Sequence, residues 1–220
     1  MTCASIPETK APRRPSCDRC RRPRAVCYCG HIEPLVTRTR LLLLQHPRER
    51  RVGVGTARMA HLSLPNSVLR VGLDFSADAV VQDMLAAPGS VRVLFPHAAA
   101  RDIGELAASD DALTLVVLDG TWSLARKLLT LNPALAALPR VAFTPRRPSA
   151  YRIRRQPAEK CVSTIEALAE VLEVIEPENG PFDRLLAPFH AMVARQVDFI
   201  TGVNAQRHRR PPRAPRPTAR

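Results

Sequence analysis

The side chains best suited to chemistry in this sequence lie in the tetrapeptide Asp119-Gly120-Thr121-Trp122. It joins the apolar run 113–118, which has the length of a buried strand, to a helix-like stretch that begins at Ser123. In an α/β fold, ligands collect at the carboxyl ends of the strands, where such turns lie. The same residues also fit a plain turn, a helix cap and a core aromatic. These four residues alone therefore leave both interpretations open.

A second group with chemical potential is the cysteine cluster Cys17-x2-Cys20-x6-Cys27-x-Cys29. Thiolates at this spacing can converge on one tetrahedral Zn²⁺, with His31 close enough to be an alternative ligand. Structural zinc would fold a segment that is too short and too polar to form its own core. The alternatives are two disulfides or four unrelated thiols. We favour zinc, because a reducing cytoplasm argues against disulfides and the tight clustering argues against unrelated thiols.

The formal net charge of +13 is concentrated at the two ends of the chain. Residues 207–220 contribute +6 and residues 1–24 contribute +5, which leaves +2 for residues 25–206. Almost all of the basic residues are Arg, which pairs with phosphate in a bidentate way that Lys cannot. The chain has no apolar run of membrane-spanning length and no signal-peptide pattern at its start, so we expect a cytoplasmic protein.

The elements that must position these groups alternate between strands and helices. This rhythm predicts an α/β fold with a mainly parallel sheet flanked by helices, in one domain with a small N-terminal zinc-binding module. Strands are predicted at 40–45, 67–71, 91–95, 113–118 and 140–143, and helices at 55–62, 77–86, 123–129, 163–175 and 182–203. The expected organisation is a disordered N-terminus (1–14), a zinc module (15–34), the main catalytic domain (35–206) and a disordered Arg/Pro-rich tail (207–220).

Six stretches, in this order, carry a resemblance to a known family. They are the four-Cys cluster, Leu44-Gln45-His46-Pro47-Arg48-Glu49, Leu94-Phe95-Pro96, Leu118-Asp119-Gly120-Thr121-Trp122-Ser123-Leu124-Ala125-Arg126-Lys127, Ser149-Ala150-Tyr151-Arg152-Ile153-Arg154 and Ser163-Thr164-Ile165-Glu166-Ala167. Together they resemble the DTW-domain family, the tRNA-uridine aminocarboxypropyltransferases, along most of the chain. Residues 1–10 and 207–220 lie outside the resemblance. Ala150, between Ser149 and Tyr151, is a mild departure from the pattern that leaves the role of Ser149 open.

The resemblance implies an enzyme that uses S-adenosylmethionine as donor and tRNA as acceptor. It would transfer the 3-amino-3-carboxypropyl group to N3 of a uridine and release 5′-methylthioadenosine. The family is also similar to SPOUT-type proteins, whose sheet carries a knotted C-terminal cofactor site, so a SPOUT-like cofactor site is expected by analogy alone. Nothing in the sequence points to an obligate protein partner.

The reaction gives each candidate residue an expected role. Asp119 is the expected catalytic residue, because a carboxylate can accept or hold the N3 proton of uridine. Arg152, Arg154 or the amides at the start of helix 163–175 would bind the carboxylate of the transferred group. The residues expected to bind the donor are Leu94, Pro96, Asp119, Thr121, Trp122, Ser163, Thr164 and Glu166. Those expected to bind substrate are Arg48, Arg126, Tyr151, Arg152 and Arg154.

Two other functions remain open on sequence grounds. A SPOUT-like RNA methyltransferase would use the same donor but release S-adenosylhomocysteine. A non-enzymatic, zinc-containing RNA-binding protein would rely on its basic ends, and would not need the Asp-Gly-Thr-Trp turn in the body of the chain. Several of the proposed site residues also have structural readings: Ser163, Thr164 and Glu166 match a capping box, and Asp119 can cap a helix.

Overall fold

The computed structural model describes residues 15–52, 55–87, 89–106, 112–151 and 161–208. Within these residues, six strands form one sheet in which every neighbouring pair is parallel. The strands lie side by side in the order β2 (Ser67–Val71), β1 (Arg40–Gln45), β5 (Leu113–Asp119), β3 (Ser90–Leu94), β6 (Arg140–Ala142) and β4 (Arg101–Asp102). Since β1 and β5 are parallel neighbours in the interior of the sheet, their carboxyl ends lie side by side at one edge.

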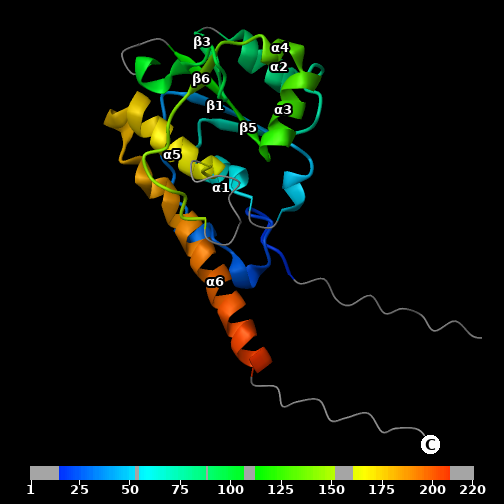
Figure 1. Cartoon of the computed structure of the whole chain (residues 1–220), viewed down its shortest axis with the longest axis vertical. Helices are drawn as coiled ribbons and strands as arrows, with labels where there is room; N and C mark the ends of the chain where they lie inside the picture. Colours follow the sequence, from blue (N-terminus) through cyan, green and yellow to red (C-terminus); the bar gives the residue numbers. More distant parts are fainter. Residues whose placement is uncertain (1–14, 53–54, 88, 107–111, 152–160, 209–220) are drawn as a thin grey trace, which may run out of the picture.

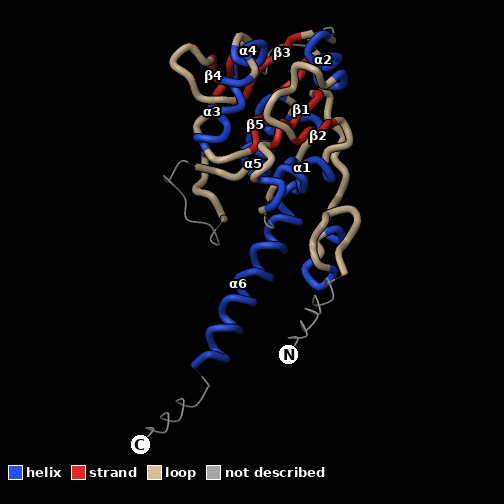
Figure 2. The backbone as a smooth tube through the Cα atoms, turned by 90° about the vertical axis from the view of Figure 1, so that its right-hand side faces the viewer, coloured by secondary structure: helices blue, strands red, loops and turns tan. Residues whose placement is uncertain are grey.

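Helices cover both faces of the sheet, as Figures 1 and 2 show. A strand turns successive side chains to opposite faces, so an apolar run such as Leu41 to Leu44, fully buried, fits a sheet covered on both sides. One layer contains α2 (Ala79–Ala86), α3 (Trp122–Leu131) and α4 (Pro133–Ala136). The other contains α1 (Ala57–Ser63), α5 (Thr164–Ile175) and α6 (Ala187–His208), whose far end extends away from the sheet.

The N-terminal module packs against the second helix layer. Tyr28 and Cys20 are buried in the same core as the apolar faces of α5 and α6. Arg58 of α1 donates a hydrogen bond to the carbonyl oxygen of Arg19 at 3.2 Å, and Arg195 of α6 donates one to the carbonyl oxygen of Cys27. The module is therefore fixed to the main domain from two sides. The 3-10 turns of the described chain are Arg24–Val26, Cys29–His31, Glu49–Arg51, Ile103–Leu106, Pro177–Asn179 and Phe182–Leu186.

The predicted α/β class, with a parallel sheet between helices, is confirmed. Strands 40–45 and 67–71 are found with their predicted bounds, while β4 and α4 are too short to leave a periodic signal. The helix predicted for 182–203 begins with a 3-10 turn, and α6 starts only at Ala187. Pro188 explains this, because a proline is tolerated in the first turn of an α-helix but breaks its interior.

The ends of the chain are only partly within the described residues. The helix α6 continues to His208, two residues into the segment predicted as a tail. Residues 1–14 and 209–220, which carry the remaining predictions of disorder, lie outside the described residues. None of the helices in the described part of the chain is long and apolar enough to cross a membrane.

Candidate functional site

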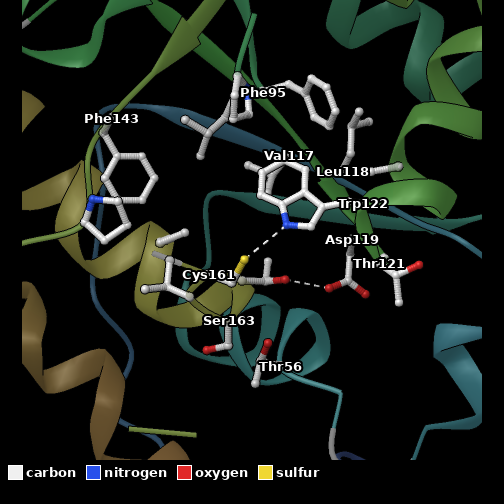
Figure 3. Close-up of a pocket in the computed structure, with 18 of the residues that line it drawn as sticks. Thr56, Phe95, Val117, Leu118, Asp119, Thr121, Trp122, Phe143, Cys161 and Ser163 are labelled. Carbon is white, nitrogen blue, oxygen red and sulfur yellow. Dashed lines mark hydrogen bonds between the residues drawn. The ribbon is translucent and has the colours of Figure 1, made fainter. Parts of the chain in front are cut away.

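A cavity of about 640 Å³ opens at the carboxyl ends of β3, β5 and β6. This is within the range of roughly 300–1,000 Å³ that holds small-molecule ligands. Four segments supply most of its wall: Leu94–Pro96 after β3, Val117–Trp122 at the end of β5, residues 142–145 after β6, and residues 161–164 at the start of α5. Figure 3 shows their side chains around the cavity. The Asp-Gly-Thr-Trp turn thus lies where the sequence predicts a ligand site.

Asp119 is held in place from two sides within this cavity. It is the last residue of β5 and only 6% exposed. Its Oδ2 accepts a hydrogen bond from Nε2 of Gln45 at 2.8 Å, and its Oδ1 accepts one from Oγ1 of Thr164 at 2.6 Å (the dashed line at Asp119 in Figure 3). Gln45 reaches it because the two residues are direct neighbours in the β1–β5 register. The two bonds orient the carboxylate from opposite elements, β1 and α5.

Gly120 allows α3 to start close to the sheet. A Cβ atom at this position would lie 3.0 Å from Cβ of Leu124 and 3.7 Å from Cβ of His46. Thr121 occupies the N-cap position of α3, but its side chain makes no capping bond and its Oγ1 lies 3.1 Å from Oγ of Ser123. Thr121 therefore takes the cap position without the side-chain bond that usually accompanies it.

Trp122 forms one wall of the cavity. Its ring packs edge-on against Phe95, with 5.6 Å between the ring centroids, and its Nε1–H donates to Sγ of Cys161 at 3.3 Å. The residue is nevertheless 42% exposed, so it does not simply fill the core. An indole fixed at two edges but open to solvent offers a flat surface on which a ligand ring can stack.

Glu166 positions the loop before α5 and does not line this cavity. Its carboxylate accepts hydrogen bonds from the N–H of Ser163 at 2.8 Å, the N–H of Ala150 at 2.8 Å and the hydroxyl of Ser149 at 2.7 Å. Ser163 is the N-cap of α5 and forms the predicted capping box with Glu166. The role of Ser149 follows from the same contacts, since it ties its loop to α5. Tyr151, at the end of that loop, is buried and lines the cavity.

The structure brings most of the predicted donor-binding residues together and places two of the predicted arginines outside the cavity. Leu94, Pro96, Asp119, Thr121, Trp122, Ser163 and Thr164 line one cavity, together with Tyr151. Arg48 and Arg126 are exposed and do not line it. Arg152 and Arg154 lie outside the described residues.

Several residues of the site were not predicted as site residues, among them Gln45, Thr56 and Cys161. Gln45 carried a usable signal, because it ends a strand that a parallel sheet pairs with the strand of Asp119. Thr56 and Cys161 carried none, since their place in the wall depends on how distant segments pack.

His46 lies beneath the turn that carries Asp119. Burial, together with the positive charges of Arg48 and Lys127, lowers the pKa of His46. Its Nδ1 accepts a hydrogen bond from the N–H of Arg48 at 3.2 Å. A neutral imidazole that accepts a local backbone bond fits the structural role expected for a histidine at the end of a strand.

The four clustered cysteines form a candidate metal centre. Their Sγ atoms all lie within 4.8 Å of one another, with 3.8 Å between Cys17 and Cys29 and 3.6 Å between Cys20 and Cys27. Four thiolates about 2.3 Å from a tetrahedral zinc ion lie about 3.8 Å apart, so the geometry fits this ion. A disulfide needs a separation of about 2.05 Å, which excludes the disulfide interpretation for these thiols.

The thiols of this cluster differ in their ionisation. Hydrogen bonds from the backbone of Cys20 and Arg19 lower the pKa of Cys17 to about 6, which favours its thiolate. Burial raises the pKa of Cys29 to about 12. Four thiolates this close together repel one another, so a bound divalent cation is needed to ionise the whole set.

The fold and the site define an α/β protein with a ligand cavity at the carboxyl ends of a parallel sheet and a separate four-cysteine centre. Residues 14–197 match the DTW domain, so the chain belongs to the DTW-domain family. The family predicted from the six motifs is therefore confirmed.

Curated relatives of the chain are named as enzymes. It is 31% identical over 199 residues to "tRNA-uridine aminocarboxypropyltransferase 2" of Mus musculus, which covers 87% of this chain and 67% of the relative. For the protein of the same name from Drosophila melanogaster the identity is 33% over 193 residues, which cover 84% of this chain and 76% of the relative. For "tRNA-uridine aminocarboxypropyltransferase A" of Arabidopsis thaliana the identity is 27% over 221 residues, which cover 86% of this chain and 83% of the relative. No solved structure gives a significant match. The chain is thus a member of an enzyme family, as the motifs predict.

Proposed function

We propose that this protein transfers the 3-amino-3-carboxypropyl group of S-adenosylmethionine to N3 of a uridine in tRNA. The observation that carries the proposal is the fixed, buried carboxylate of Asp119 in a ligand-sized cavity, in a chain whose relatives are named for this transfer. The proposal also includes a SPOUT-like cofactor site, which rests only on the similarity of the family to SPOUT-type proteins.

The lining of the cavity suits a positively charged, partly aromatic donor. Its described lining residues include the acids Asp119 and Glu49 and no Lys or Arg, which favours a sulfonium cation. Phe95, Trp122 and Phe143 provide apolar and aromatic surface for an adenine ring. The start of α5, with Ser163 and Thr164, lines the cavity, and the N-terminus of a helix favours a carboxylate.

The transfer forms one bond and breaks one. N3 of uridine attacks the γ-carbon of the donor, the carbon–sulfur bond breaks, and its electron pair leaves with 5′-methylthioadenosine. The N3 proton must be removed or shared, because protonated N3 is a poor nucleophile. In this proposal the carboxylate of Asp119 holds that proton or orients the donor, and Gln45 and Thr164 keep it aimed. Charge is lost in the transition state, so an apolar wall favours the reaction.

The four-cysteine centre would hold a structural Zn²⁺ in this proposal. Four thiolate ligands leave no open coordination position, so the ion would not act on substrate. Its role would be to keep the N-terminal module folded against α1 and α6.

The test is a reaction of the purified protein with S-adenosylmethionine and unmodified tRNA transcripts, followed by nuclease digestion and mass spectrometry of the nucleosides. We expect a uridine that carries the aminocarboxypropyl mass, with 5′-methylthioadenosine as by-product. The product should disappear in Asp119→Asn and persist in Asp83→Asn, a matched change on the exposed side of α2. A methyl mass with S-adenosylhomocysteine would establish the methyltransferase instead. If the protein binds tRNA but forms no new nucleoside, it is a non-enzymatic RNA-binding protein instead.

A further inference from the structure

Positive charge borders the cavity on the side of α1 and the N-terminal module. The turn after β1 carries Arg48 and Arg50, both exposed, and between them Glu49 lines the cavity. The charges of Arg48 and of Lys127 in α3 both lower the pKa of His46, which places both side chains near that buried ring. Figure 1 shows this light-blue turn between α3 and the dark-blue N-terminal module.

Further basic side chains extend from this turn to the cysteine module. Arg58 of α1 donates to the carbonyl oxygen of Arg19, inside the Cys17–Cys20 turn, at 3.2 Å. Burial and the positive charge of Arg21, and to a smaller degree that of Arg50, lower the pKa of Arg58. Arg58 therefore stands between the module and the turn after β1. We call Lys127, Arg48, Arg50, Arg58, Arg21 and Arg19 the basic path.

The basic path forms no salt bridge with an acid among the described residues. Some arginines on other surfaces do form ion pairs: Arg70 pairs with Asp78, and Arg101 pairs with Glu105. Glu33, an acid of the N-terminal module, is itself paired with Arg184. A row of unpaired guanidinium groups is expensive to hold together unless an anion binds there.

Arg21 adds an independent observation. Its φ angle is 60°, in the left-handed region that costs a residue with a side chain about 1 kcal/mol or more relative to glycine. Glycine would make this turn after Cys20 without strain. The arginine therefore brings a charge to the surface at a position where the backbone alone favours another residue.

We infer that the basic path binds the phosphate backbone of the tRNA substrate, from the cysteine module to the mouth of the cavity. The inference rests on the proposed function for the identity of the nucleic acid. Guanidinium groups match phosphate in a bidentate way, and a series of neighbouring basic side chains fits a strand that carries repeated charges. The cysteine module then has a functional task beyond stability, because it holds Arg19 and Arg21 near Arg58.

The experiment measures binding of fluorescently labelled tRNA across a series of salt concentrations. The test protein is the double variant Arg21→Gly with Arg50→Gln, and the charge-matched control is Arg38→Gln with Arg101→Gln. The control removes two exposed arginines that form surface ion pairs outside the basic path. Arg21→Gly relieves the backbone at this turn, so loss of binding by it cannot come from a misfolded module. A thermal melt at or above that of the wild type checks this.

Each lost phosphate contact lowers the slope of log K against log salt by about 0.9. We therefore expect the test variant to lose about two units of slope and to bind up to about 60-fold more weakly at 0.1 M salt, with the control close to wild type. If the test variant matches its control in slope and affinity, the proposal that the basic path binds tRNA is refuted. Formation of the modified uridine by the wild type would still support the proposed function. If the wild type forms no modified uridine but the test variant alone loses binding, the proposed function fails and the basic path stands as a nucleic-acid surface.

Discussion

The hydrogen bond between Thr164 and Asp119 gives the sharpest test of the site. Thr164→Val removes the hydroxyl that donates to Oδ1 at 2.6 Å and keeps the branched shape of the side chain. A hydrogen bond to a charged group contributes about 1.5–3 kcal/mol, and each 1.36 kcal/mol corresponds to a tenfold change. If this bond acts by aiming the carboxylate in the transition state, the variant should lose about 10- to 160-fold in kcat/KM.

The assay is the initial rate of modified-uridine formation at limiting tRNA, with a thermal melt of each variant. Thr164→Ser is the matched control, because it keeps the hydroxyl, and it should recover most of the rate. The reasoning is refuted if Thr164→Val reacts as fast as the wild type, or if Thr164→Ser is as slow as Thr164→Val. A rate loss that simply follows a lower melting temperature would assign the bond to stability instead.

Three more predictions follow from the same structure. Trp122 is the only tryptophan and is 42% exposed at the cavity, so binding of S-adenosylmethionine should change its fluorescence in a saturable way. If the fluorescence does not change at concentrations that support turnover, the donor binds elsewhere. Cys20→Ser should abolish the zinc measured by elemental analysis and lower the melting temperature, while Cys161→Ser keeps the zinc. Burial and Arg58 lower the pKa of His61, so the unfolded chain binds more protons below about pH 6.5 and stability should fall as the pH drops from there. His61→Gln should flatten that fall in thermal melts, and an unchanged slope would contradict it.

The sequence predicts those parts of the fold that depend on neighbours along the chain. The strand 40–45 is a run of leucines that only a doubly covered sheet can bury, and the cysteine cluster is defined by spacing alone. The capping box of Ser163 and Glu166 spans three residues and is found as predicted. The same pattern did not reveal that Glu166 also binds Ser149 and Ala150, because that contact depends on where the loop returns to α5.

The donors to Asp119 show the limit of such reasoning. Gln45 reaches Asp119 only because β1 and β5, far apart in the chain, pair in a register that sets the two residues side by side. A slip of one residue would turn the side chain of Gln45 to the opposite face of the sheet. Hydrophobic patterning predicts that these strands exist, but neither their order nor their register can be deduced from one sequence.

The two substrates of the proposed reaction carry opposite charges, and the structure separates the surfaces that suit them. Gln45 and Thr164 are neutral donors that orient the carboxylate of Asp119, and this acid favours a cationic sulfonium inside the cavity. The basic path lies outside, where solvent and salt screen it, and acts on a polyanion over a longer range. An arginine placed within the cavity would attract phosphate but repel the donor. The separation therefore lets one protein bind a cation and a polyanion next to each other, with Glu49 and His46 at the boundary.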